Sequence, residues 1–223
     1  GDNGKTLILV ATSGDTGKAA LEGFRDVEGT EIIVFYPAKG VSAMQKLQMT
    51  TQQGGNVHVA GINGNFDDAQ TAVKAIFTDK EVIDKLKSHG IEMSSANSIN
   101  WGRLAPQIAY YVSAYCDLLT SGEINKGDKI NFVVPTGNFG NILAGYYAYR
   151  MGIPVGKLIV ASNANNILSD FFNTGKYDVN RNFFKTMSPS MDILVSSNLE
   201  RLLFEVSGRD AKKIAGIYSD LKK

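Results

Sequence analysis

The sequence contains one cysteine, Cys116, in 223 residues, which excludes an intramolecular disulfide framework. No apolar run approaches the roughly 20 residues that a membrane-spanning helix needs. An excess of charge of one sign is also missing, because 23 Lys and Arg oppose 22 Asp and Glu for a net charge of +1. No global field therefore attracts nucleic acid or an anionic membrane, and any anion must be bound by a local site.

The start of the chain, GDNGKTLILVATSGDTG, lacks the charged region, long apolar region and cleavage site of a signal peptide. A cytoplasmic enzyme fits the single cysteine and the lack of a membrane-length apolar run. Because a strand begins almost at once and the last residues read as a helix, we expect both ends to be cut from a longer chain. Such a piece would expose apolar faces, which predicts a homodimer. The two histidines, His58 and His89, have no metal-ligand partner at a useful spacing, so we expect no metal site.

Apolar runs of strand length, rich in Val and Ile, alternate with helical patterns. The expected strands are 6–11, 31–37, 56–61, 131–135 and 157–162. The expected helices between them include 18–29, 41–53 and a third over 69–77 that Asp67 could cap. Strand, helix and strand recur, and right-handed crossovers return each strand parallel to the last. The sequence therefore predicts an α/β fold with mostly parallel sheets.

The alternation breaks around SSANSINWGRLAPQ, residues 94–107, and a long amphipathic helix follows over 108–122. Cys116 lies in this helix, where we expect it to pack as a small hydrophobic residue. We place a boundary here, with a smaller αβ lobe over 1–100 and part of a larger αβ lobe over 101–223.

Two glycine-rich loops lead from a strand into a helix, ATSGDTGKAA at 11–20 and PTGNFGN at 135–141. Glycines let the backbone turn sharply and approach a ligand, and the unpaired amides of the next helix can bind an anion. The first is not a Walker A loop, because Ala19 stands where Ser or Thr is needed. In the second, Gly137 and Gly140 are three residues apart, a spacing that favours a single phosphate over a pyrophosphate. The alternative is that both loops are simply tight turns.

A third polar segment, SSANSINWGRL, gathers short hydroxyl and amide side chains around Arg103. Arginine suits bidentate recognition of phosphate or carboxylate, and the neighbouring side chains supply neutral donors. The segment predicts a second anion site. The alternative is a capped helix start with a solvated arginine.

Four segments in this order resemble the threonine synthase family, pyridoxal-phosphate enzymes of fold type II: ATSGDTGKAA, YPAKGVSAMQKLQMTTQQGGNVHVAGINGNFDDAQ, SSANSINWGRLAPQ and VVPTGNFGNILAGYYAYRMGIP. SMDILVSSNLERLLFE also resembles a family segment. The resemblance runs from about Leu7 to Leu203 and implies the tryptophan synthase β-like fold, two three-layer αβα lobes with mostly parallel sheets. It also implies conversion of O-phosphohomoserine and water to threonine and phosphate, which needs one phosphate site for pyridoxal phosphate and one for the substrate.

The resemblance assigns roles to three sets of residues. The cofactor phosphate would be held by Gly137, Asn138, Phe139, Gly140 and Asn141. The loop that approaches the cofactor ring and the substrate carboxylate would be Ser13, Gly14, Asp15, Thr16 and Gly17. The substrate phosphate would be held by Asn97, Ser98, Asn100 and Arg103, with Arg103 as the strongest contact.

The sequence departs from the family at the Schiff-base lysine, which the family carries upstream of the first strand in a motif of the FKD type. Only Lys5 precedes that strand, and its setting, GDNGKTL, matches nothing catalytic. We therefore expect no catalytic residue in this chain, which would be an inactive central piece of a threonine synthase.

Two other functions stay open at this stage. One is a different fold type II lyase, such as a threonine-synthase-like phospho-lyase; the phosphate site of SSANSINWGRL argues against a threonine dehydratase. The other is a non-catalytic phosphometabolite-binding module that uses the two glycine loops.

Overall fold

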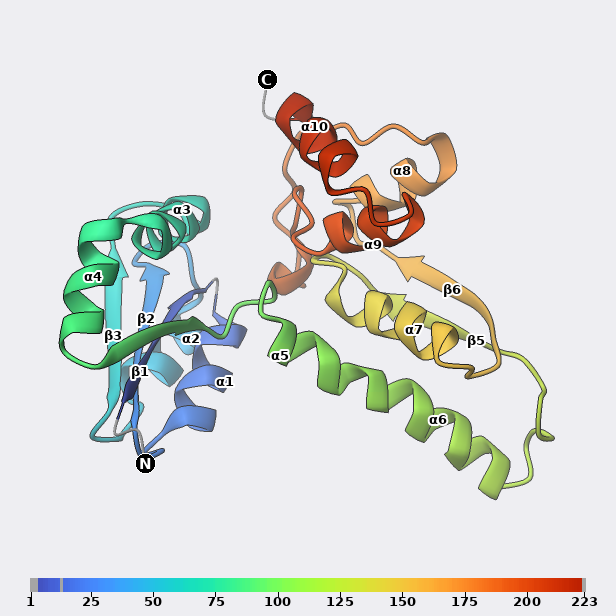
Figure 1. Cartoon of the computed structure of the whole chain (residues 1–223), viewed down its shortest axis with the longest axis horizontal. Helices are drawn as coiled ribbons and strands as arrows, with labels where there is room; N and C mark the ends of the chain where they lie inside the picture. The colour runs from blue at the N-terminus through green and yellow to red at the C-terminus, as the bar shows by residue number, and fades with distance from the viewer. Residues whose placement is uncertain (1–3, 13, 222–223) are drawn as a thin grey trace. The chain divides into compact units, whose positions relative to one another are not determined.

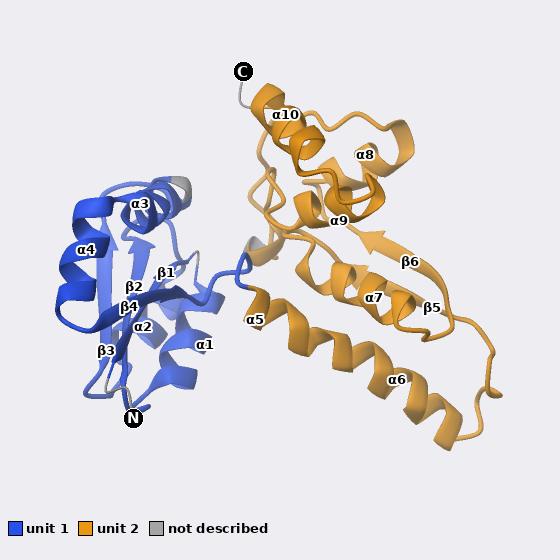
Figure 2. Ribbon diagram, in the orientation of Figure 1, with its two compact units in different colours: residues 1–100 blue, residues 101–223 orange. Residues whose placement is uncertain are grey.

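The computed structural model describes residues 4–12 and 14–221, apart from the side chains of residues 67 and 189. The chain divides into two compact units, Gly1–Asn100 and Trp101–Lys223 (Figure 2). Each unit carries its own buried apolar cluster, so each is described by its own elements. No helix in the described part of the chain is long and apolar enough to cross a membrane.

The first unit alternates strands and helices along the chain (Figure 1). Its elements are β1 (Lys5–Ala11), α1 (Asp15–Phe24), β2 (Thr30–Pro37), α2 (Ala43–Thr50), β3 (Val57–Ile62), α3 (Phe66–Thr78), α4 (Lys80–Ser88) and β4 (Ile91–Ser95). The strands form one parallel sheet in the order β3-β2-β1-β4. All four carboxyl ends therefore lie at one edge of the sheet, where the loops that follow β1 and β4 begin.

Side chains that alternate along β1 face two separate clusters. Ile8 and Val10 pack with α1 and α2, whereas Leu9 and Ala11 pack with α3. Helices thus cover both faces of this sheet, which explains why its central strands, β1 and β2, are continuous apolar runs. The first unit is a three-layer αβα arrangement.

The second unit contains helices around a pair of strands. Its elements are α5 (Trp101–Leu104), a 3₁₀ turn η1 (Ala105–Gln107), α6 (Ile108–Thr120), β5 (Ile130–Pro135), α7 (Gly140–Arg150), β6 (Val155–Ala161), α8 (Ile167–Thr174), a second 3₁₀ turn η2 (Pro189–Met191), α9 (Leu199–Val206) and α10 (Ala211–Leu221). Strands β5 and β6 are parallel, and Val134 pairs with Val160.

The core of the second unit lies on one face of these strands. Phe132, Val134, Leu158 and Val160 pack with α6, α7, α8 and α9. Residues on the opposite face are solvent-exposed, since Val133 is 65% and Ile159 is 40% exposed. A parallel strand pair usually has both faces covered, so the second unit presents a bare apolar sheet face.

The α/β class with parallel sheets is confirmed, and the predicted strands agree with the observed ones to within two residues. Helix α1 ends at Phe24 rather than near residue 29, because the chain turns there through Asp26 and Gly29, both with positive φ. The expected cap at Asp67 is wrong: α3 begins at Phe66, and Asn65 and Asp68 form a reciprocal capping box.

Two further differences concern residues that sequence patterns described poorly. Strand β4, IEMSS, pairs with β1 over five positions. It was not expected, because its polar composition does not resemble that of a buried strand. Cys116 is exposed rather than packed, so the prediction for this residue is wrong.

Candidate functional site

The loop of residues 136–139 joins β5 to α7 in the second unit. The amide of Thr136 donates to the carbonyl of Ala161 at 2.9 Å, which keeps the end of β5 paired with β6. Phe139 then adopts a left-handed conformation, with φ 66° and ψ −1°, and α7 begins at Gly140. A left-handed residue other than glycine is uncommon, so the turn is held in place by its surroundings.

The backbone amides of this loop are available to a ligand. No acceptor among the described residues takes the N–H groups of Gly137, Asn138, Phe139, Gly140 or Asn141. The N-terminus of α7 adds the positive end of a helix dipole. A run of unpaired amides at a helix start suits a phosphate group, so the donor set fits the phosphate of the cofactor that the sequence implies.

The two glycines of the loop lie against residues from the far end of the chain. A Cβ on Gly137 would come within 3.0 Å of Ile193 Cγ1 and 3.4 Å of Met191 Cα. A Cβ on Gly140 would lie 3.4 Å from Asn198 Nδ2, an ordinary contact. Gly137 therefore permits a close approach that a side chain would hinder, and residues 191–198 form the back of the loop.

Asn141, the last residue of this set, is held by Tyr111 of α6. The Tyr111 hydroxyl lies 2.9 Å from both the carbonyl oxygen and Oδ1 of Asn141. Burial raises the pKa of Tyr111 to about 12, so this hydroxyl remains a donor at neutral pH. The loop is thus supported on both sides within one unit.

The loop between β1 and α1 is organised by a residue that sequence reasoning missed. Thr12 is 1% exposed, and its Oγ1 accepts from the amides of Gly14 and Gly17, both at 2.9 Å. Two of the amides expected to face a ligand therefore have an internal partner. The sequence pattern that could have indicated this role is a threonine directly after a strand and shortly before two glycines.

Replacing Thr12 with Val should lower the free energy of unfolding by roughly 2–6 kcal/mol, because two buried N–H donors lose their acceptor at about 1–3 kcal/mol each. Urea unfolding would measure the change. Thr12→Ser is the matched control, because it keeps Oγ and should retain most of the stability. A Thr12→Val chain as stable as the parent would show that the hydroxyl of Thr12 does not stabilise the loop.

The remaining residues of the first loop lead into α1 and form its first turn. Gly14 has φ 143°, and the carboxylate of Asp15 accepts from Gln45 Nε2 at 2.9 Å. Gln45 also closes the capping box of α2, so it links the two helix starts. Thr16 lies in the first turn of α1, and Gly17 is buried against the sheet. Ser13 lies outside the described residues.

In the polar segment that follows β4, two asparagine side chains form hydrogen bonds to backbone groups of the first unit. The Nδ2 of Asn97 donates to the carbonyl of Ala11 at 2.7 Å, and its Oδ1 accepts from the amide of Ala11 at 3.2 Å. Asn97 therefore ties the ends of β4 and β1 together. The Nδ2 of Asn100 donates to the carbonyl of Ser95 at 2.5 Å.

The two other residues of the predicted substrate set lie on either side of the unit border. Ser98 belongs to the first unit, and Arg103 lies in α5 of the second. Desolvation lowers the pKa of Arg103 below its ordinary value, yet a guanidinium stays charged at neutral pH.

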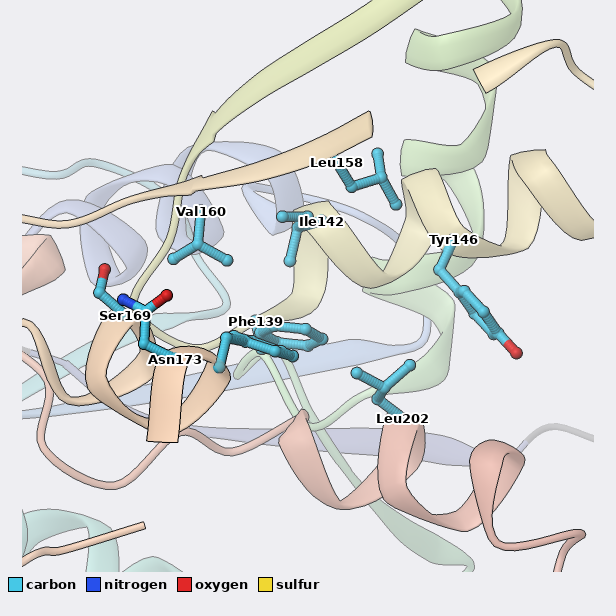
Figure 3. A pocket seen from close by; sticks show the side chains of 9 residues that line it. Phe139, Ile142, Tyr146, Leu158, Val160, Ser169, Asn173 and Leu202 are labelled. Atoms are coloured by element: carbon cyan, nitrogen blue, oxygen red, sulfur yellow. The ribbon is translucent and has the colours of Figure 1, made fainter. Parts of the chain in front are cut away.

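A pocket of about 350 Å³ adjoins the second loop on the side of the core (Figure 3). Phe139 forms one wall, and Ser169 and Asn173 of α8 supply the few polar groups. No charged side chain is among the nine lining residues, so this pocket does not suit an anion. It is lined by Phe139, Ile142, Tyr146, Leu158, Val160, Ser169, Phe172, Asn173 and Leu202.

No cluster of three or more His, Cys, Asp or Glu that could hold a metal ion occurs among the residues that the structure describes.

The chain matches the pyridoxal-phosphate-dependent enzyme family over residues 1–219. Because this match covers nearly the whole chain, the chain belongs to that family.

Within the family, the chain is similar to threonine synthases. It is 45% identical to the threonine synthase of Pseudomonas aeruginosa over 218 residues, 98% of this chain and 44% of that protein. It is 47% identical to human threonine synthase-like 1 over 223 residues, 97% of this chain and 30% of that protein. The crystal structure of a pyridoxal-phosphate-bound threonine synthase from Brucella melitensis superimposes with a TM-score of 0.84 at 47% identity, covering 99% of this chain and 45% of that one. The chain thus spans less than half the length of these relatives.

Proposed function

We propose that this chain is a central part of a threonine synthase, an enzyme that converts O-phospho-L-homoserine and water to L-threonine and phosphate in the cytoplasm. The observation that carries the proposal is the row of unpaired amides at Gly137–Asn141, at the start of α7. Similarity of about 45% to threonine synthases supports the choice within the family.

In this proposal, pyridoxal phosphate is the group that stabilises negative charge on the substrate carbon skeleton when it is bound. Gly137, Asn138, Phe139, Gly140 and Asn141 bind its phosphate through backbone N–H groups. Gly14, Asp15, Thr16 and Gly17, with Ser13, form the loop that approaches the ring and the substrate carboxylate. The amides of Gly14 and Gly17 already donate to Thr12 Oγ1, so these two glycines shape the loop rather than bind the ligand through their amides.

The substrate phosphate is assigned to the segment after β4. Arg103 supplies the positive charge, and Ser98 and Asn100 supply neutral donors. Asn97 orients the segment, because both polar atoms of its side chain bond to Ala11. Together with the loop at Gly137–Asn141, which would bind the cofactor phosphate, these residues would give the two phosphate sites that the reaction needs.

A binding experiment tests the assignment of the cofactor site. Pyridoxal phosphate should bind this chain at least ~10-fold more tightly than pyridoxal, because only the former carries the anion that the loop amides recognise. Inorganic phosphate should compete, whereas chloride at equal ionic strength should not. Fluorescence titration measures each affinity. Equal affinities for pyridoxal and pyridoxal phosphate would reject the phosphate loop.

A second candidate is a phospho-lyase of the same family, because such an enzyme would use the same two phosphate sites. Human threonine synthase-like 1 is as similar to this chain as the threonine synthases are, so similarity alone does not choose the reaction. Such an enzyme would release phosphate and leave a 2-keto acid and ammonia instead of threonine. Product analysis of the whole protein with O-phosphohomoserine separates the two reactions.

A further inference from the structure

The carbonyl of Asn138, in the middle of the loop 136–139, is bound from a distant segment. The backbone N–H and the side-chain Nδ2 of Asn198 both donate to this oxygen at 3.1 Å. Ser197 Oγ donates to Asn138 Oδ1 at 3.2 Å. Asn198 is completely buried, so these bonds form without competition from water.

The position of this carbonyl determines the direction of the next amide. The carbonyl of Asn138 and the N–H of Phe139 belong to one peptide group, and no described peptide bond is cis. In a trans peptide the C=O and the N–H point in opposite directions. With the oxygen turned toward Asn198, the N–H of Phe139 must point away from residues 197 and 198, and it is one of the amides that no described acceptor takes.

The reverse orientation would harm an anion site. If this peptide turned over, the carbonyl of Asn138 would face the bound anion and an N–H donor would be lost from the loop. Phe139 is in the left-handed region, which costs about 1–3 kcal/mol for such a residue and therefore needs external support. One support is its ring, 5% exposed and stacked on Phe172 at 5.8 Å. The other is the pair of bonds from Asn198.

Asn198 is itself fixed in the orientation that this task needs. Arg201 Nε donates to Asn198 Oδ1 at 3.1 Å, which leaves Nδ2 to face Asn138. The preceding residues are anchored by Tyr177, whose hydroxyl accepts from the amide of Ser196 at 2.8 Å and donates to the carbonyl of Leu194 at 3.2 Å. Burial raises the pKa of Tyr177, so the phenol keeps its proton.

We infer that Asn198 is a positioning residue of the phosphate loop: it holds the peptide between Asn138 and Phe139 so that the Phe139 N–H is offered to the phosphate. The inference rests on the proposed function, because it takes the anion of that site to be the ligand. Asn198 acts through the loop backbone.

Three variants test the inference. Asn198→Asp keeps the shape and the partner of Arg201 but replaces the donor with an oxygen that repels the Asn138 carbonyl. Asn198→Ala removes both polar atoms. Tyr115→Phe is the matched control, because Tyr115 is a buried residue of the same unit whose hydroxyl accepts from the amide of Gly127 at 2.9 Å, in the connection between α6 and β5.

For the parent and each variant, two quantities are measured: the affinity for inorganic phosphate and for pyridoxal phosphate, and the free energy of unfolding in urea. Both changes at Asn198 should weaken binding at least ~10-fold, while Tyr115→Phe should lower stability and keep the affinity within about twofold of the parent. If the Asn198→Asp chain binds as tightly as the parent, Asn198 has no positioning role and the inference is overturned.

A crystal structure of the Asn198→Asp chain gives a readout that needs no ligand. The peptide between Asn138 and Phe139 should be turned over or in two conformations. If the parent binds no phosphate but this peptide turns over in the variant, the proposed function fails and the structural role of Asn198 stands. An unchanged peptide overturns the inference whatever the parent binds.

Discussion

After incubation with pyridoxal phosphate and reduction with borohydride, this chain should carry no lysine labelled at one-to-one stoichiometry, and it should form no detectable threonine from O-phosphohomoserine. The family places its Schiff-base lysine before the first strand, whereas Lys5, the lysine nearest to that position, is the first residue of β1. Lys5 is 60% exposed in its side chain and pairs with Glu31 at 3.5 Å on the protein surface. General base catalysis by a positioned group typically contributes about 10²- to 10⁴-fold, so its loss alone would suppress turnover.

Peptide mapping by mass spectrometry measures the labelling, with the Pseudomonas aeruginosa threonine synthase as the positive control. Low labelling spread over many exposed lysines is the expected background. One lysine labelled in nearly every molecule would contradict the prediction and identify a catalytic residue within this chain.

Two glycines of α1 should respond in opposite directions to the same substitution. Gly17→Ala should lower the free energy of unfolding by roughly 1–3 kcal/mol, the usual cost of overpacking a core. A Cβ there would come within 2.6 Å of Thr12 Cγ2, 2.9 Å of Val34 Cγ1 and 3.0 Å of Met49 Sδ. These atoms belong to buried side chains that cannot move aside freely, so α1 would have to shift away from the sheet.

Gly23→Ala is the matched substitution in the same helix. No atom lies within 4 Å of a Cβ on Gly23, so only helix propensity changes, and stability should rise by about 0.5–1 kcal/mol. Chemical unfolding of both variants beside the parent measures the pair. Equal stability changes in the two variants would show that Gly17 is not tightly packed against β1 and β2.

Local patterns were sufficient for the strands and for the position of the second loop. The Val- and Ile-rich runs predicted β1, β2, β3, β5 and β6, because parallel strands buried in a sheet have continuous apolar sequences. Strand β4 escaped prediction because it lies at the sheet edge beside β1 and carries Glu92, Ser94 and Ser95. Edge strands need less burial, so a short one such as β4 can have the composition of a loop, although β3 at the other edge keeps two valines and an isoleucine.

The supporting partners of the site could not be predicted, because they come from distant parts of the chain. The pattern GNFGN predicts a turn with free amides, but nothing in it indicates that Asn198 binds the Asn138 carbonyl. Likewise, the amide side chains of SSANSIN indicate hydrogen bonding, but the sequence does not show that Asn97 donates to the carbonyl of Ala11. The sequence shows which residue types can form hydrogen bonds, but only the folded structure shows which partners they bond to.

The distance along the chain between the loop and its support has a consequence for the order of folding. Asn138 and Asn198 are 60 residues apart in sequence, so their contact closes a long loop and forms at a high cost in chain entropy. Strands β5 and β6 and helix α7 need only shorter-range contacts. We therefore expect the strand pair to assemble before the segment 191–198 docks, so that during synthesis on the ribosome the phosphate loop would reach its final geometry only after residue 198 has emerged.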